Sequence, residues 1–212
     1  MKIFLAAGHG GIDPGATSLS VNERDELIKI VSGVVSQLLV VIKPPDEVLH
    51  VPDELALEGE VNWINGKAIA GEIAIAVEVH LNANQGSPGS GTETYWGCEK
   101  LAKTLQQKAV EVLKLPDRGV KSGDNFYFNR MTGPPSAILE LGFINNPSDL
   151  QAVRDRGALA IVEGIKAYLQ DTGPSTPEQP APSPDYKGLY EQEKNKVAEI
   201  RVLLQKIVLD FK

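Results

Sequence analysis

Four side chains in this chain could together support hydrolysis assisted by a metal ion. They are His9, Glu23, His80 and Glu140. A catalytic zinc ion usually takes three protein ligands, often two His and one Glu, and leaves one position to water. A carboxylate that does not bind the metal can then accept a proton from that water. The sequence contains both parts, and two of its 3 histidines stand in contexts that suit a site.

His9 follows a short apolar segment, Ile3 to Ala7, and lies in the glycine-rich stretch AGHGGIDPGA. The apolar run predicts a buried strand, and the glycines predict a turn directly after it. Because ligands gather at the carboxyl ends of strands in open α/β folds, His9 is a candidate metal ligand. A turn histidine with a purely structural role is the alternative.

Glu23 stands at the start of a predicted helix, with Asn22 as a plausible N-cap. Apolar residues recur in this stretch at helical spacing. They are Leu27, Val31, Val34, Val35 and Leu38. A glutamate in the first turn also has an ordinary explanation, because it complements the helix dipole. The helix therefore places Glu23 but does not by itself assign it a role.

His80 ends a predicted strand over residues 73–80, in which large apolar residues alternate with smaller or polar ones. The alternation places Glu78 on the same side of the strand as His80. The last strand position before a loop favours a site over a buried structural histidine. For Glu78 three roles stay open: a partner that orients the imidazole, a substitute ligand, or a carboxylate salt-bridged on the far side of the sheet.

Glu140 lies in another short apolar segment, SAILELGFINNP. Burial among apolar neighbours disfavours the charged form, so we expect the pKa of Glu140 to rise toward the range of a general base. A carboxylate paired with Arg130 or Lys121 is the alternative. A buried acid without a task is costly, which favours the catalytic interpretation.

Taken in order, four segments resemble a known family: GHGGIDPGA, NERDELIKI, VEVHLNAN and ILELGFINNPSD. They are similar to the zinc-dependent N-acetylmuramoyl-L-alanine amidases of the third amidase class, which act on peptidoglycan. The resemblance runs from about Lys2 to about Leu169. By matched position it implies one zinc ion per chain and a catalytic carboxylate. The implied ligands are His9, Glu23 and His80, and the implied catalytic residue is Glu140.

The resemblance also implies a reaction, the hydrolysis of the amide between the lactyl group of N-acetylmuramic acid and L-alanine of the stem peptide. Some positions depart from the family pattern. Ala6 and Ala7 stand where relatives often carry Asp-Pro, and Glu78 stands where they commonly carry a small or polar residue. The stretch 44–63 matches poorly, so no substrate contact is assigned there. Two other functions stay open: another zinc amidohydrolase or peptidase, and a non-catalytic cell-wall-binding module that would not need Glu140.

The rest of the pattern predicts an α/β fold with a single twisted, mostly parallel sheet flanked by helices. The expected strands are at 2–6, 38–43, 73–80, 92–96 and 136–140. The expected helices are near 23–36, 58–70, 98–114 and 149–169. These elements define a predicted catalytic domain over residues 1–170.

Beyond this domain the composition changes. Residues 171–185 are rich in proline and predict an extended linker. Residues 186–212 predict a C-terminal amphipathic helix with a coiled-coil seam, which needs a partner because it is short. We expect it to mediate homo-oligomerisation, while docking on the enzyme's own surface, or on the wall or a membrane, stays an alternative.

Charge and hydropathy restrict the partners. A formal net charge of -7 argues against nucleic acid, and no apolar run suggests stable membrane insertion. The single cysteine, Cys98, excludes an internal disulfide. The apolar run near the N-terminus, Ile3 to Ala7, is too short for the hydrophobic region of a signal peptide. We therefore expect a phage or prophage endolysin, made in the cytoplasm and released to act on the cell wall. Secretion, with a signal segment removed from this sequence, is the alternative.

Overall fold

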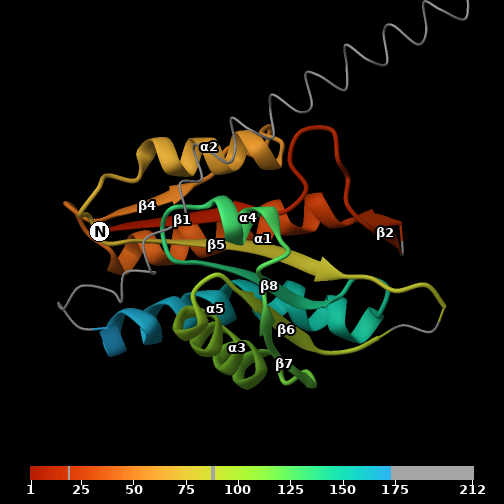
Figure 1. Ribbon diagram of the computed structural model, residues 1–212. Helices are drawn as coiled ribbons and strands as arrows, with labels where there is room; N and C mark the ends of the chain where they lie inside the picture. The colour runs from red at the N-terminus through yellow and green to blue at the C-terminus, as the bar shows by residue number, and fades with distance from the viewer. Residues whose placement is uncertain (19, 87–88, 173–212) are drawn as a thin grey trace, which may run out of the picture. The chain divides into compact units, whose positions relative to one another are not determined.

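The computed structural model describes residues 1–18, 20–86 and 89–172, and within them a six-stranded sheet carries the candidate site (Figure 1). In spatial order the strands are β4 (Glu47–His50), β1 (Lys2–Ala7), β5 (Ala74–Asn82), β8 (Ser136–Phe143), β6 (Thr92–Trp96) and β7 (Asp117–Ser122). The first four are parallel; β6 is antiparallel to β8, and β7 is parallel to β6. The predicted mostly parallel sheet is confirmed.

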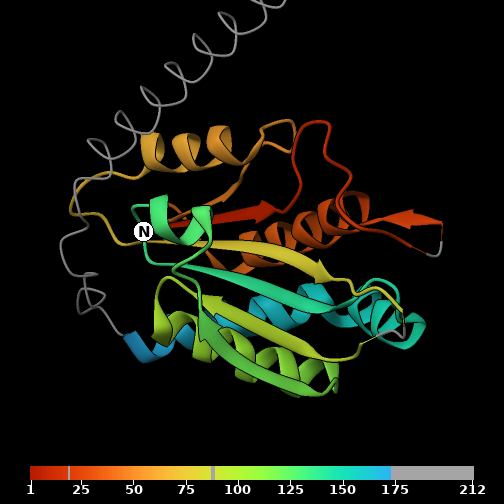
Figure 2. The same cartoon turned by 45° about the vertical axis from the view of Figure 1, so that its right-hand side comes forward.

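Helices cover both faces of this sheet. The larger hydrophobic core includes buried residues of α1 (Glu23–Val41), α3 (Glu99–Leu113) and α5 (Pro147–Thr172). The smaller core includes residues of α2 (Leu57–Lys67) and α4 (Tyr127–Met131). Helices α3 and α5 pack side by side, as Figures 1 and 2 show.

Strand β5 explains why the site lies on the side of the smaller core. Its residues alternate between the two faces, so Ile75 and Val77 enter the larger core while Ala74 and Ala76 enter the smaller one. The same alternation places the side chains of Glu78 and His80 on the same face of the sheet as Ala74 and Ala76. The polar groups of the site therefore lie on the face of the sheet against which α2 and α4 pack.

The prediction of a strand over 38–43 is wrong. Helix α1 continues to Val41 and ends shortly before Pro44, which cannot extend a helix. Leu39, Val40 and Val41 are 52%, 70% and 53% exposed, so this apolar run is not a core strand. The edge strand that pairs with β1 is instead the more polar β4.

The other predicted strands and helices are confirmed with shifts of a few residues at their ends. Strand β7, helix α4 and a two-stranded ribbon of β2 (Thr17–Ser18) and β3 (Val21–Asn22) were not predicted. The predicted linker at 171–185 lies almost wholly outside the described residues, and the predicted helix at 186–212 lies entirely outside them. In the part of the chain that the structure describes, no helix combines the length and apolar character needed to cross a membrane.

Candidate active site

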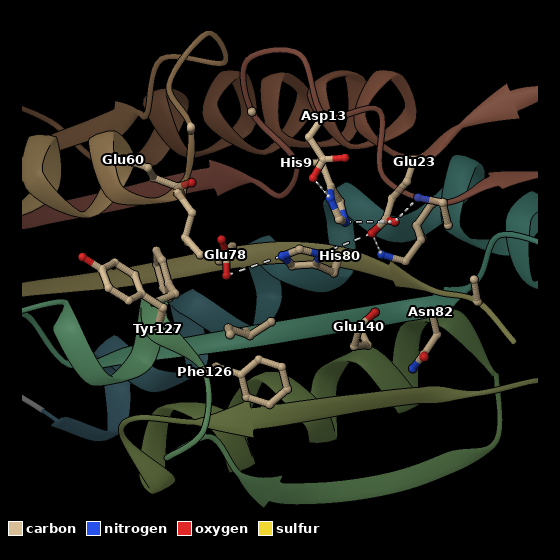
Figure 3. Close-up of a pocket in the computed structure, with 18 residues that line it drawn as sticks. His9, Asp13, Glu23, Glu60, Glu78, His80, Asn82, Phe126, Tyr127 and Glu140 are labelled. Atoms are coloured by element: carbon tan, nitrogen blue, oxygen red, sulfur yellow. Dashed lines mark hydrogen bonds and ion pairs between the residues drawn. The ribbon is translucent and has the colours of Figure 1, made fainter. Parts of the chain in front are cut away.

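Three of the predicted site residues converge although they come from three separate elements. The Nε2 atom of His9 lies 3.1 Å from Oε2 of Glu23, and Nδ1 of His80 lies 3.3 Å from Oε1 of the same carboxylate. One ligand atom from each residue falls within 4.8 Å of the others. Figure 3 shows the two imidazoles directed toward the Glu23 carboxylate. This spacing allows all three residues to hold one metal ion.

Two glycines make room for the imidazoles. A Cβ atom at Gly8 would lie 2.3 Å from Cε1 of His80, and one at Gly15 would lie 2.6 Å from Cδ2 of His9. His9 itself has a φ angle of 66°, a conformation unusual for a residue with a side chain. The glycine-rich turn after β1 therefore sets the position of His9 and leaves space for the His80 ring.

Glu23 is the anchor of the cluster. Asn22 caps α1 by accepting a hydrogen bond from the Asp25 amide, which confirms the predicted cap. The buried Glu23 carboxylate accepts hydrogen bonds from the Leu81 amide at 2.8 Å and the Ala16 amide at 3.0 Å. Burial alone would raise the pKa of Glu23, but hydrogen bonds from both histidines hold it well below its ordinary value. Glu23 is therefore ionised, as a metal ligand must be.

Each imidazole also has a carboxylate at its other nitrogen. Asp13 Oδ2 lies 2.9 Å from Nδ1 of His9, and Glu78 Oε2 lies 3.5 Å from Nε2 of His80. Carboxylates in this position orient metal-binding histidines. A salt bridge of Glu78 on the far side of the sheet is thus excluded. Sequence reasoning missed Asp13, although its place four residues after His9, inside the same glycine-rich turn, was an available signal.

Glu140 lies on β8, where it is the register partner of His80. Its buried Oε2 atom has no hydrogen-bond partner among the described residues. Burial raises the pKa of Glu140 to about 7. Lys121, one of the partners considered from the sequence, bonds to Glu93 instead, and Arg130 is exposed. The structure therefore leaves a carboxyl group beside the cluster, free to exchange a proton.

The cluster and Glu140 open onto a cavity of about 650 Å³. Phe126 and Tyr127 form part of its wall, and Glu60 reaches it from α2 (Figure 3). Glu60 is only 3% exposed, and burial together with the charge of Glu78 raises its pKa to about 9. This residue falls in the stretch 44–63 to which the sequence assigned no role. The pocket is therefore rich in carboxyl groups.

The sequence of this chain is similar to a known protein family and to several of its relatives. Residues 3–170 match the family described as N-acetylmuramoyl-L-alanine amidase. The protein YqiI of Bacillus subtilis is 34% identical over 178 residues, which cover 78% of this chain and 84% of YqiI. The amidase LytC of the same organism is 31% identical over 185 residues, covering 79% of this chain but only 35% of LytC.

Solved structures show the same likeness. An N-acetylmuramoyl-L-alanine amidase from Clostridium difficile 630 has a TM-score of 0.71 at 28% identity, covering 81% of this chain and 98% of that one. The catalytic domain of CwlV from Bacillus (Paenibacillus) polymyxa has a TM-score of 0.69 at 29% identity, covering 80% and 99%. The family match spans most of the chain and includes every residue of the cluster, so this chain belongs to the N-acetylmuramoyl-L-alanine amidase family of hydrolases.

Proposed function

We propose that this chain hydrolyses the amide bond between the lactyl group of N-acetylmuramic acid and L-alanine of the peptidoglycan stem peptide. The proposal includes one zinc ion per chain, with His9, Glu23 and His80 as ligands. It depends most on one observation, which is that Glu140 lies on the strand next to His80 and that its buried Oε2 atom has no hydrogen-bond partner among the described residues. The family membership and the metal-binding geometry support it.

The donor set fits zinc. Two imidazole nitrogens and one carboxylate oxygen are ligands that catalytic zinc takes, and three protein ligands leave room for a further one. Asp13 and Glu78 supply the outer carboxylates that such histidines usually have. When bound, zinc supplies a Lewis acid that polarises a carbonyl and lowers the pKa of water.

Glu140 then serves as the group that moves protons. In its ionised form it accepts a proton from the attacking water, and in its protonated form it returns that proton to the amine of L-alanine as the amide bond breaks. Without metal, burial raises the pKa of Glu140 to about 7, and zinc nearby would favour the ionised form that accepts the proton. Asp13 and Glu78 hold the imidazole rings, and Phe126 and Tyr127 form part of the cavity wall.

The test is cleavage of purified peptidoglycan sacculi by the protein, first stripped of metal with a chelator and then resupplied with zinc. We expect zinc to restore the release of stem peptides that begin with a free L-alanine amine, detected by amine labelling and mass spectrometry. A new amine at another residue would favour a different zinc amidohydrolase or peptidase. Zinc binding with sacculus binding but no cleavage would favour a wall-binding module.

The domain organisation is a separate proposal. Residues 1–170 form the catalytic domain, 171–185 a linker, and 186–212 a helix for oligomerisation or docking. Light scattering of the whole chain and of a chain ending at Gln170 tests this, since a mass equal to that of one monomer for each of the two chains would reject self-association. A role as an endolysin is also a proposal, and it predicts that cells producing the chain lyse only when their membrane is permeabilised.

A further inference from the structure

A second polar cluster lies next to Glu140, on the side away from the metal ligands. Its centre is Glu93 on β6, which is the register partner of Glu140 and only 2% exposed. The Glu93 carboxylate accepts hydrogen bonds from Asn82 at 2.7 Å, Tyr95 at 3.0 Å, Arg118 at 2.8 Å and Lys121. His80, Glu140 and Glu93 thus form one row across three neighbouring strands, and the side chains of Arg118 and Lys121 reach Glu93 from the next strand, β7.

The cluster retains positive charge. One carboxylate faces two cations, and burial of Glu93 is outweighed by its hydrogen bonds, which hold its pKa at about 2. The Glu93 side chain is 3% exposed, whereas those of Arg118 and Lys121 are 38% and 41% exposed. Arg118 donates to Glu93 through Nε. Its two terminal nitrogens, which suit a carboxylate, are not needed for that bond.

Aromatic rings hold the two cations in place. The guanidinium of Arg118 lies 5.0 Å from the centroid of the Phe143 ring, and Nζ of Lys121 lies 5.6 Å from that of Tyr95. Because these contacts and Glu93 restrict both side chains before any ligand arrives, little conformational entropy remains to be lost on binding. Fixed, partly exposed cations of this kind are typical of a binding site for an anion.

The electrostatics of the pocket make such a site useful. Glu23, Glu78 and Glu140 line the cavity, so the fixed cations Arg118 and Lys121 beside it favour the approach of an anionic substrate. The stem peptide of peptidoglycan is such a substrate, because residues after L-alanine carry free carboxylates.

The distances also agree. The charged groups of Arg118 and Lys121 lie at Glu93 on β6, which is one strand spacing, about 5 Å, from β8. An extended peptide spans about 3.5 Å per residue, so two residues cover that distance. If the scissile amide lies between the metal cluster and Glu140, a peptide that runs toward β6 brings the carboxylate of its second residue to these cations.

We propose that Arg118 and Lys121, anchored by Glu93, form a subsite that binds the free carboxylate of the second stem-peptide residue. This inference depends on the proposed amidase function. Glu93 acts as a positioning residue for the two cations, and Arg118 and Lys121 contact the substrate.

The test uses two un-cross-linked glycan substrates whose stem tripeptides differ in one group. Both are L-alanyl-γ-D-glutamyl-L-lysine, and the α-carboxyl group of the second residue is a free carboxylate in one and an amide in the other. The zinc-loaded enzyme should cleave the carboxylate substrate with about a 10-fold higher kcat/KM, mainly through a lower KM. In Lys121→Met and Arg118→Gln the ratio between the substrates should fall toward one, and Arg118→Lys should restore part of it.

Lys103→Gln is the matched control, because Lys103 is an exposed lysine on α3 that pairs with Glu99, and the ratio for this variant should stay at the wild-type value. The ratio of two rates from one preparation does not depend on how much of a variant is folded. Equal cleavage of both substrates by the wild type, or an unchanged ratio in both the Lys121 and Arg118 variants, would reject the subsite. Cleavage of neither substrate would reject the proposed amidase function instead.

Discussion

Replacing Glu140 by glutamine should have opposite effects on catalysis and on stability. Among the described residues the buried Oε2 atom has no hydrogen-bond partner, and burial raises the pKa of Glu140 from 4.5 to about 7. Glutamine has a similar shape and cannot ionise. The variant should lose the proton transfer that Glu140 performs, with a fall in kcat of about 10² to 10⁴-fold, while it keeps its zinc.

The effect on stability follows from the same pKa. A rise from 4.5 to about 7 corresponds to about 3 kcal/mol, at about 1.4 kcal/mol per pH unit. Between these two values the folded protein keeps Glu140 protonated while the unfolded chain ionises it, so the folded state binds more protons and loses stability as the pH rises. The metal-free Glu140→Gln variant should match the wild type near pH 4.5 and exceed it by up to about 3 kcal/mol above pH 7.

Urea unfolding in the presence of a chelator, at intervals from pH 4.5 to 8, measures this difference. The chelator is needed because a nearby cation would favour the ionised form and reduce the gain. Glu54→Gln, which changes an exposed carboxyl group, is the control and should follow the wild type throughout. A difference between the Glu140 variant and the wild type that stays constant with pH would refute the assignment of a raised pKa.

Three further predictions concern the ligands and the fold. His9→Ala or Glu23→Gln should reduce bound zinc from one per chain to nearly none by elemental analysis, and full retention would contradict the ligand assignment. Asp13→Asn should weaken zinc binding by about 10 to 100-fold in competition with a chromogenic chelator, whereas unchanged affinity would exclude an orienting role. Arg154→Met should cost about 1 to 2 kcal/mol in urea unfolding, because the buried Glu26 loses a hydrogen bond of 2.7 Å; no loss would show that Lys29 suffices.

The candidate site could be predicted from the sequence because its residues stand at recognisable local positions. His9 and His80 follow apolar runs with strand character, and Glu23 begins a helix with a good cap. The carboxyl ends of β1 and β5, being parallel neighbours, meet at one edge of the sheet, so residues distant in sequence come together.

The edge strand that pairs with β1, which is β4, could not be predicted in the same way. The apolar run from Leu38 to Ile42 resembles a buried strand, but it extends a helix whose last turn is exposed. Strand β4 is short, begins with a charged residue and has no fully buried position. Its place is set by pairing with β1, which is a tertiary contact that local hydrophobicity does not encode.

The polar networks around the site could not be predicted from the sequence either. Glu93 and Glu140 become neighbours only through the antiparallel register of β6 and β8, which depends on both strands at once. Arg118 and Lys121 come from an edge strand that has little apolar pattern. Glu60 lies on a helix that was predicted near 58–70, but the sequence assigned no role to its carboxyl group.

Product analysis combined with zinc content tests the central claim most directly. Purified protein should contain one zinc per chain and release stem peptides with a free L-alanine amine from sacculi. Both zinc and activity should disappear together on chelation and return together with zinc. Release of the same peptides at full rate by a chain with no bound metal would contradict the account.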